Sequence, residues 1–291
     1  MGLVYRPAGE QPWLISHASV PFAEPLDGGL HRIWFSPRDA ANHSHVSWLV
    51  LDLARPNRIL DSAPAPVLGC GPVGSFDDCG AMMSWLTAGR LYYSGWNLRG
   101  TVPFHVSIGA AEQTGDGGWR RIPGPVMDRG LDDPLFCSNP CVLRDGEVWH
   151  MWYIGALGWE QIGGRWSASY QVCHAHSTDG VHWEGRGAVA VALEGDEFAI
   201  ARPSVLRTGD EWLMWFSVRT RSHSYRLGAA RSTDGLHWRR APELADLQPA
   251  ASAWDSEMVA YPHVFDHAGR RWMLYCGNGF GHSGFGLAVQ E

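Results

Sequence analysis

His176-Ser177-Thr178-Asp179-Gly180-Val181-His182-Trp183 returns almost unchanged as Arg231-Ser232-Thr233-Asp234-Gly235-Leu236-His237-Trp238. The interval of about 55 residues suggests an array of similar structural units. Ser-Thr-Asp-Gly is a turn sequence, because Asp accepts hydrogen bonds from the backbone that follows it and Gly adopts a positive φ without strain. We therefore predict that both stretches are structural turns between strands, and that the tryptophan after each turn belongs to the outer strand.

A longer unit surrounds each turn and can be followed through the whole chain. Residues 139–153 read as a strand, a turn at Gly146 and a second strand rich in aromatic residues. Short apolar runs separated by turn residues are typical of strands joined by hairpins. The unit occurs five times, in copies that begin near residues 13, 76, 134, 197 and 255.

Five copies of a four-stranded unit predict an all-β fold, namely a five-bladed β-propeller of four-stranded antiparallel blades in one domain, residues 1–291. One sheet cannot bury both of its faces, whereas neighbouring blades around an axis can. Residues 54–75 and 110–130 are rich in turn residues and are expected to be connectors. The last copy lacks a fourth strand, so we predict that Leu3-Val4-Tyr5-Arg6 pairs with the strand near residues 285–290 and closes the ring.

This combination resembles the five-bladed propeller glycosidases, which are glycoside hydrolase families 43, 32 and 68 and the mannoside phosphorylases of family 130. The resemblance rests on the five repeats, the Ser-Thr-Asp-Gly-x-x-Trp turn and the Trp-x-Met-Trp-Tyr strand at residues 149–153, and it spans nearly the whole chain. It implies an enzyme that uses axial carboxylates on a small glycan or glycoside. Because one fold hosts many activities, the resemblance is more specific for the fold than for the reaction.

Composition narrows the classes of partner and the compartment. A net charge of −7 argues against a nucleic-acid or anionic-membrane partner. No apolar run is long enough to span a membrane, and residues 1–10 show no secretion signal. None of the six cysteines forms a Cys-x-x-Cys pair. We therefore expect mostly reduced thiols in a cytoplasmic protein, with a secreted, disulfide-bonded protein as the alternative.

Candidate catalytic residues come from superposing the five repeats on their turn glycines. The residues that then occupy equivalent positions are Pro21, Met82, Asn139, Arg202 and Tyr261. In a propeller the innermost strands begin beside the central channel. The residues four places earlier are therefore expected at its mouth, and these are His17, Asp78, Leu135, Phe198 and Glu257.

Asp78 and Glu257 form the candidate carboxylate pair, with His17 between them. The resemblance implies this role, because glycosidic cleavage needs one carboxyl group to protonate the leaving oxygen and a second one to activate water or attack carbon. Opposed blades favour an inverting separation of about 6.5–9.5 Å. Asp77 and Asp255 are the nearest competitors for these two roles.

The candidate site departs from the pattern of the resembling families. They typically carry an aspartate at the start of the first inner strand, where this chain has His17-Ala18-Ser19, and family 43 has an acid in the third blade, where this chain has Ser138-Asn139. His17 titrates near neutral pH and is itself a candidate acid, base or phosphate ligand. Hydrolysis and phosphorolysis are therefore weighed against a non-catalytic sugar-binding propeller and a propeller repurposed as a cyclase or lyase.

Further polar and aromatic side chains are candidates for binding the substrate. They are Glu197, Arg202, Asn139, Tyr261, Trp96 and Trp159. We expect Arg202 to pair with Glu257 or with a substrate carboxylate. The two tryptophans are expected to stack on a sugar ring.

Two His-x-His pairs, at His43 with His45 and at His174 with His176, place two imidazoles on one side of a strand. Such a pair is a feature of some metal sites, but no third ligand accompanies either pair at a diagnostic spacing. Neither a metal nor another cofactor is expected.

Overall fold

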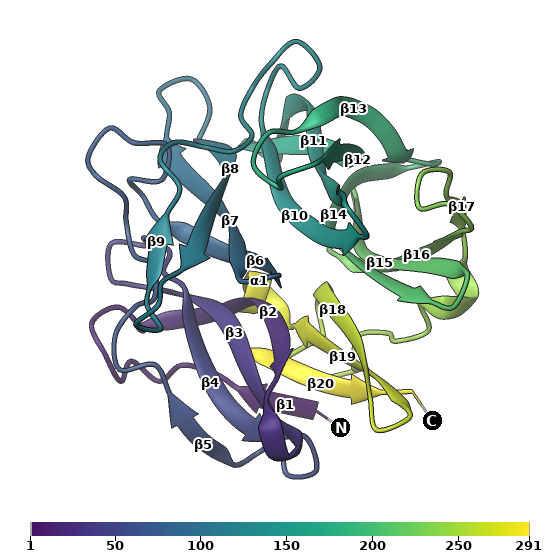
Figure 1. Cartoon of the computed structure of the whole chain (residues 1–291). Coiled ribbons are helices and arrows are strands. Elements are labelled where there is room, and N and C mark those ends of the chain that lie inside the picture. The colour runs from purple at the N-terminus through teal and green to yellow at the C-terminus, as the bar shows by residue number, and fades with distance from the viewer. Residues whose placement is uncertain (1, 291) are drawn as a thin grey trace.

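The computed structural model describes residues 2–290, which form an all-β protein with three short helical turns (Figure 1). The strands form three four-stranded antiparallel sheets and one eight-stranded sheet. The helical turns are η1 (Asp27–Gly29), η2 (Pro242–Leu244) and α1 (Asn278–Gly281). Among these residues, no helix combines the length and the apolar character that crossing a membrane requires.

The first two sheets are meanders in which each strand pairs with the next. The first contains β2 (Ser16–Pro25), β3 (Leu30–Arg38), β4 (Ser47–Asp52) and β5 (Ile59–Ser62), and the second contains β6 (Ala81–Thr87), β7 (Arg90–Leu98), β8 (Phe104–Gln113) and β9 (Trp119–Arg121). The segments 54–75 and 110–130 are therefore not plain connectors. That expectation was wrong because the turn residues flank a short outer strand, β5 or β9, instead of replacing it.

The eight-stranded sheet consists of two further meanders joined at one point. One contains β10 (Cys137–Asp145), β11 (Val148–Ile162), β12 (Arg165–Ser177) and β13 (Glu184–Val191), and the other contains β14 (Glu197–Thr208), β15 (Glu211–Thr220), β16 (Arg226–Ser232) and β17 (Arg239–Arg240). A single parallel pair, Tyr170 with Ala199, links β12 to β14.

The two ends of the chain meet in the last sheet. It contains β18 (Ala260–His267), β19 (Arg270–Cys276), β20 (Phe285–Val289) and β1 (Gly2–Tyr5). Leu3 lies opposite Gly286, and Tyr5 lies opposite Phe285. The predicted pairing of the N-terminal strand with the C-terminal one is therefore confirmed, and it covers an edge that would otherwise be open.

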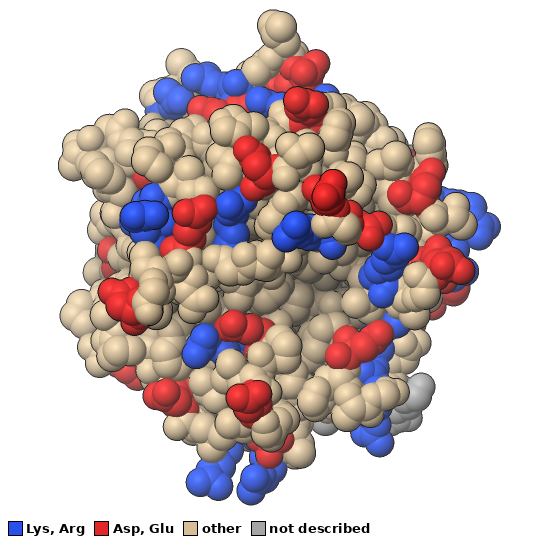
Figure 2. Space-filling view, in the orientation of Figure 1, with Lys and Arg blue, Asp and Glu red and all other residues tan. Residues whose placement is uncertain are grey.

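The first strand of every meander lies at the centre of the molecule. β2, β6, β10, β14 and β18 contact one another in a closed ring, and Figure 1 shows the sheets extending outward from it. In the same orientation, Figure 2 shows a hollow near the middle of this face, with acidic and basic side chains interspersed around it. Neither sign of charge forms a continuous patch on this face.

The two Ser-Thr-Asp-Gly stretches are turns between a third and a fourth strand, as predicted, but Trp183 and Trp238 each lie one residue before the outer strand and not in it. In the first turn, Ser177 Oγ accepts hydrogen bonds from the N–H groups of Asp179 and Gly180, at 3.1 and 2.8 Å. Asp179 Oδ1 accepts from the N–H groups of the two residues after Gly180. Gly180 has φ 72°, and the second turn repeats these bonds from Ser232 onward.

Each turn also binds the preceding meander. The hydroxyl of Tyr92 in β7 donates to the carbonyl oxygen of Gly180 at 2.8 Å. The indole N–H of Trp152 in β11 donates to the carbonyl oxygen of Gly235 at 2.9 Å. The repeated motif thus stabilises contacts between sheets as well as its own turn.

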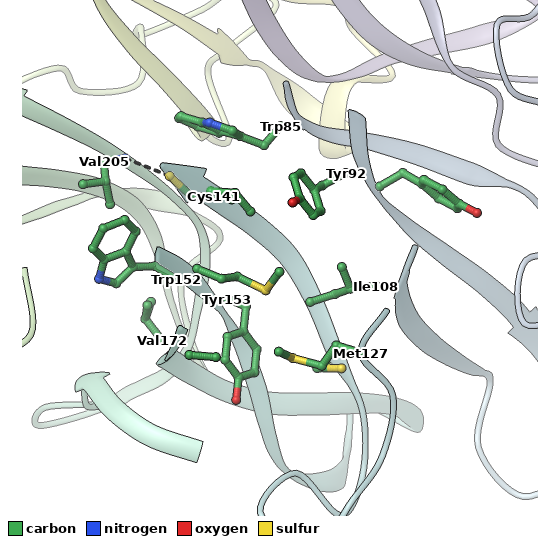
Figure 3. Packing of buried hydrophobic residues seen from close by; sticks show 14 of the residues in the cluster. Trp85, Tyr92, Ile108, Met127, Cys141, Trp152, Tyr153, Val172 and Val205 are labelled. Carbon is green, nitrogen blue, oxygen red and sulfur yellow. Dashed lines mark hydrogen bonds between the residues drawn. The ribbon is translucent and has the colours of Figure 1, made fainter. Parts of the chain in front are cut away.

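The largest hydrophobic cluster fills the space between the sheets (Figure 3). Trp152 and Tyr153 of β11 pack there with Trp85 of β6, and all three side chains are at most 4% exposed. The N–H of Val205 donates to Cys141 Sγ at 3.3 Å, which joins β14 to β10 inside this cluster. Burial of such large aromatic side chains supplies much of the stability of the ring.

Candidate functional site at the start of the inner strands

Four backbone hydrogen bonds define equivalent positions in the inner strands. In each case an N–H group donates to a serine or cysteine in the second strand of the preceding meander, over 2.7–3.3 Å. The donors are Val20, Met83, Asn139 and Tyr261, and their acceptors are Cys276, Ser36, Ser94 and Ser217, respectively. A bulge follows each donor.

The alignment on turn glycines is therefore wrong by one residue in the first two sheets. Val20 is the equivalent of Asn139 where Pro21 was expected, and Met83 is the equivalent where Met82 was expected. The physical reason is hairpin length. η1 lengthens the connection between β2 and β3. In the second sheet the paired residues Met82 and Ser94 are only 12 positions apart, whereas the equivalent pairs in the three later meanders are 16 apart.

The corrected register changes which residues start the inner strands at equivalent places. Four positions before the aligned residues stand Ser16, Cys79, Leu135, Phe198 and Glu257. Glu257 keeps its place, and His17 and Asp78 each lie one residue away. The aligned residues with a left-handed backbone are Val20, Asn139, Arg202 and Tyr261, and none of them is acidic.

Arg202 of β14 lies at the centre of the molecule, where its side chain contacts the inner strands β2 and β6. Its side chain is fully buried and lies 5.7 Å over the Trp85 ring. The guanidinium donates to the backbone oxygens of Pro21, at 3.2 Å, and of Ser84. Burial lowers the pKa of Arg202 to about 10. The expected pairing with Glu257 is wrong, because carbonyl groups of two other inner strands occupy the donors.

Asn139 is also enclosed by the protein. Its side chain is 8% exposed, and Ser138 Oγ donates to its Oδ1 at 3.4 Å. Its backbone φ is 48°, a conformation that asparagine adopts more readily than most residues. The local hydrogen bond and the left-handed backbone thus explain why an asparagine occupies position 139.

Glu197 belongs to a structural ion pair that recurs around the ring. Its Oε2 accepts a hydrogen bond from Arg240, whose strand, β17, ends the same meander. Likewise, Asp77 Oδ2 accepts from Arg121 at 3.0 Å. The Glu197 side chain is 17% exposed. Its expected role as a third carboxylate at the mouth is wrong, because Arg240 holds it within its own sheet.

The neighbouring aspartates Asp77 and Asp255 each accept a hydrogen bond from a tyrosine of their own sheet. Tyr93 donates to Asp77 at 3.0 Å, and Tyr275 donates to Asp255 at 3.0 Å. Both aspartates are buried, with exposed fractions of 1% and 6%. The two competitors for the catalytic roles are therefore buried, and each accepts a hydrogen bond from a tyrosine hydroxyl, although Asp255 Oδ1 has no hydrogen-bond partner among the described residues.

Asp78 and Glu257, by contrast, have no cationic partner among residues 2–290. Asp78 Oδ2 accepts from the N–H of Gly74 at 3.0 Å. Glu257 is exposed, and its own N–H donates to Asn278 Oδ1 at 2.7 Å. Neither carboxylate lines any of four surface cavities of 310–800 Å³, nor does His17. Both carboxylates are accessible to a ligand, but these cavities do not bring them together.

His17 lies in a polar and aromatic cluster at the start of β2. Its Nδ1 is 2.9 Å from Ser16 Oγ, and its ring meets the His282 ring edge-on at 5.2 Å. Burial, and then the charges of Arg38 and His282, lower the pKa of His17 to about 4. His17 is therefore neutral at pH 7, so its imidazole can take part in hydrogen bonds, but it is not a standing acid and the lowered pKa makes it a weak base.

Arg38, the last residue of β3, has no carboxylate partner among the described residues. Its Nη1 donates to Asn42 Oδ1 at 2.8 Å, and its guanidinium lies 5.8 Å over the Trp96 ring. Burial lowers its pKa, and proximity to Tyr261 acts in the opposite direction. A partly desolvated cation without a counter-ion favours an anionic or strongly polar group nearby.

Tyrosines extend this cluster toward β12 and β16. The Tyr261 ring lies 5.8 Å from the Tyr225 ring and 6.5 Å from the Phe280 ring, on which it stacks. The Tyr225 hydroxyl is hydrogen-bonded to the Tyr170 hydroxyl. Arg219 lies 5.5 Å over the Tyr225 ring. Burial is the main cause that raises the pKa of both Tyr225 and Tyr261, so both hydroxyls stay protonated.

The two tryptophans expected to bind sugar lie in different surroundings. Trp96 donates from Nε1 to Ser44 Oγ at 3.1 Å, and its ring faces Arg38. Trp159 packs 5.1 Å from Phe104 and lines a separate cavity of 310 Å³. Trp96 thus adjoins the His17 cluster, whereas Trp159 belongs to the neighbouring cavity.

The two His-x-His pairs form hydrogen bonds within the protein. His43 Nδ1 and His45 Nε2 each lie 3.2 Å from Asp39 Oδ2. His174 Nε2 lies 3.1 Å from His150 Nδ1. In the part of the chain that the structure describes, no group of three or more His, Cys, Asp or Glu residues is arranged to hold a metal ion.

Sequence reasoning missed several members of the His17 cluster. It considered only the starts of the inner strands, whereas these residues come from second and third strands and from the segment around α1. They are Arg38, Arg219, Tyr170, Tyr225, Phe280 and His282. One signal was present, because Arg38 and Arg219 each lie at or near the end of an apolar second strand.

Two curated relatives match the whole chain. The uncharacterized protein Rv1502 of Mycobacterium tuberculosis strain H37Rv is 41% identical over 297 residues, which cover 100% of this chain and 98% of the relative. The uncharacterized protein MT1551 of strain CDC 1551 gives the same identity and coverage. No protein-family model matches the sequence.

Solved structures with a similar fold are glycoside hydrolases and their relatives. The structure of one glycoside hydrolase has a TM-score of 0.73 at 17% identity, covering 100% of this chain and 90% of that one. A structure from the GH130 family of mannoside phosphorylases has 0.71 at 13%, covering 99% and 91%. A thermostable family-43 glycoside hydrolase has 0.68 at 13%, covering 96% and 91%. The resemblance to the propeller glycosidase superfamily is therefore confirmed for the fold.

Proposed function

Because this chain belongs to the same family as the uncharacterized protein Rv1502 of Mycobacterium tuberculosis and has the fold of propeller glycosidases, we propose that it binds and acts on a small glycan or glycoside. The reaction is hydrolysis, with inversion favoured, or phosphorolysis. The observation that carries the proposal is the cluster of His17, His282, Arg38 and Tyr261 at the start of the inner strands. It is polar, aromatic and partly buried, and Arg38 in it lacks a counter-ion.

We assign the whole chain to one five-bladed propeller domain. The support is the closed ring of five inner strands and the single residue pair that joins the two meanders of the eight-stranded sheet. Counted separately, those two meanders are a third and a fourth blade. The β1–β20 pairing then completes a fifth blade and closes the ring.

Glu257 and Asp78 are the carboxylates proposed for the reaction. Both lack a cationic partner and are less buried than Asp77, which pairs with Arg121, and Asp255, which lies under Tyr275, so a substrate can use them. Neutral His17 would accept a hydrogen bond from a sugar hydroxyl or take a proton from an attacking group. Arg38 would stabilise negative charge on a phosphate or on a leaving oxygen. The same groups could assist attack on the glycosidic carbon by water or by phosphate.

The test is a screen of aryl glycosides and oligosaccharides, with and without inorganic phosphate. Turnover is then compared among wild type, Glu257→Gln, Asp78→Asn and the control Glu147→Gln, which removes an exposed carboxylate in the β10–β11 hairpin. Loss of a positioned acid or base lowers the rate by about 10²- to 10⁴-fold. NMR of the first product gives its anomeric configuration, and inversion is expected.

Normal turnover by both carboxylate variants would remove Glu257 and Asp78 from the mechanism. A covalent glycosyl-enzyme trapped on either residue would contradict inversion. A requirement for phosphate would identify phosphorolysis, and full activity without it would identify hydrolysis.

A non-catalytic sugar-binding propeller is the second candidate. The observation that favours it is the absence of an acid among the left-handed residues Val20, Asn139, Arg202 and Tyr261 of the inner strands. A binder of this kind would retain glycans in a binding assay and turn over none of them. Substitution of Glu257 or Asp78 would then weaken retention only.

A further inference from the structure

A cavity of 310 Å³ lies beside the start of β10, between the second and third meanders. The β7–β8 connection contributes Arg99, Thr101 and Val102 to its lining, and the segment before β10 contributes Arg129 and Leu135. Its volume is at the lower end of the roughly 300–1,000 Å³ of small-molecule sites. The cavity therefore suits one sugar ring better than an extended chain.

The charge of this cavity distinguishes it from the other three. Its lining includes Arg99, Arg129 and His105 and contains no aspartate or glutamate. Each of the other three cavities described above has at least one acidic side chain in its lining. His105 is already engaged, since its Nε2 lies 2.7 Å from Asp128 Oδ1. The two arginines are therefore the groups that give the cavity its positive character.

Arg99 and Arg129 do not hold another part of the protein in place. Both are exposed, and neither guanidinium forms a hydrogen bond or an ion pair among residues 2–290. In this chain Arg121 and Arg186, by contrast, hold buried aspartates. Free arginines that converge on one cavity are suited to a carboxylate or phosphate group, which the guanidinium binds through paired N–H donors.

An aromatic wall completes the cavity. The Trp159 ring lies 5.1 Å from the Phe104 ring and 5.8 Å from the Phe136 ring, and all three side chains line the cavity. Flat apolar faces of this kind bury the C–H face of a sugar, while its polar groups bond elsewhere. Aromatic wall and free arginines together fit a sugar that carries an acidic group.

The aromatic side chains of the cavity pack, through buried rings, against those of the cluster around His17. The Phe136 ring lies 6.2 Å from the Tyr170 ring, and the Tyr170 hydroxyl bonds the Tyr225 hydroxyl. Tyr225 packs on Tyr261, which belongs to the cluster. A row of aromatic side chains therefore leads from the cavity to the proposed site of reaction.

We propose that this cavity is a subsite for an acidic sugar, so that the substrate is a glycan carrying a uronate carboxylate or a phosphate ester. Arg99 and Arg129 bind the acidic group, and Trp159 with Phe104 and Phe136 packs against the ring. The net charge of −7 gives no long-range attraction for such a ligand, so recognition rests on these local contacts. The inference rests on the proposed function at the His17 cluster and names its substrate class.

The test probes an immobilised glycan array that contains neutral oligosaccharides, their uronic-acid counterparts and their phosphorylated counterparts. The full chain is compared with Arg99→Gln/Arg129→Gln. The matched control is Arg58→Gln/Arg239→Gln, which removes two exposed arginines that line none of the four cavities. We expect wild type to retain acidic glycans in preference to neutral ones. The cavity variant should lose about tenfold or more in affinity for them, and the control should not.

The two acidic sets distinguish the source of the charge, because a uronate preference identifies a carboxylate and a phosphate preference identifies a phosphate ester. Retention of neutral glycans only, or equal retention by the cavity variant and the control, would overturn the acidic subsite and leave the proposed function standing. Retention of no glycan at all would contradict both.

Discussion

The hydroxyl of Tyr92 donates a hydrogen bond to the carbonyl oxygen of Gly180 across 2.8 Å, although the two residues are 88 positions apart in the chain. Both groups are buried. The bond joins the second strand of one meander to the Ser-Thr-Asp-Gly turn of the next. Trp152 and Gly235 repeat it one meander later.

Tyr92→Phe should therefore destabilise the protein by about 1–2 kcal/mol, because a buried carbonyl group is left without its donor. Urea denaturation gives the free energy of unfolding. Tyr5→Phe is the control, since its hydroxyl lies 3.5 Å from Glu10 at the surface. If the two variants unfold at the same urea concentration, the bond between the sheets contributes nothing measurable.

Asp133→Asn should be far more destabilising than Asp132→Asn. Asp133 Oδ2 accepts from Arg186 at 3.1 Å and from the Tyr153 hydroxyl at 2.8 Å, and its side chain is 2% exposed. Breaking a buried ion pair on one side costs about 3–5 kcal/mol. Asp132 is exposed, so its substitution should change the free energy of unfolding by less than about 0.5 kcal/mol. If Asp133→Asn lowered the free energy of unfolding as little as Asp132→Asn, the buried pair would not be structural.

Removal of residues 1–5 should lower the melting temperature, because it uncovers the edge of β20 and opens the ring. It also removes Tyr5, whose ring packs 5.3 Å from Phe35 and 6.1 Å from Phe285. Calorimetry on the shortened chain measures the effect. An unchanged melting temperature would mean that closure by β1 does not stabilise the fold.

The protein should lose stability as the pH falls from 6.5 to about 4. Burial, then His150 and His176, lower the pKa of His174 from 6.5 to about 4. The unfolded chain therefore binds a proton in this window that the folded chain does not, and stability rises with pH across it. At pH 7 neither state is protonated at this site and the penalty is absent.

The matched variants for this effect are His174→Gln and His223→Gln. His174 contributes up to about 3 kcal/mol to the difference between pH 7 and pH 4. His174→Gln should therefore show a flatter dependence of the unfolding free energy on pH than wild type. His223 is exposed, and its substitution should leave the slope unchanged. Equal slopes for all three proteins would contradict the role of His174.

Much of the architecture could be predicted from the sequence, because it depends on local patterns that repeat. The Ser-Thr-Asp-Gly turns require only short-range hydrogen bonds and a glycine with positive φ, so Gly180 and Gly235 identify them. The need for one more strand in the last meander likewise points to residues 3–6. These local sequence patterns can be recognised even where the hairpins differ in length.

The site could be predicted only in part, because side-chain direction alternates along a strand and a slip of one residue reverses it. Hairpins of unequal length produced such a slip at Pro21 and Met82. The adjacent acids Asp77 and Asp78 show the consequence. One is buried under Tyr93 and Arg121, whereas the other has no cationic partner.

The sequence by itself determined the repeated unit, its turns and the strand that closes the ring, since each follows from neighbouring residues. The tertiary structure alone decided that Arg202 is enclosed on backbone carbonyls, that Arg240 holds Glu197, and that Arg38 lies beside His17. These contacts join residues that are far apart in the chain. Their geometry depends on how the strands and sheets pack around the axis, and no local pattern encodes that packing.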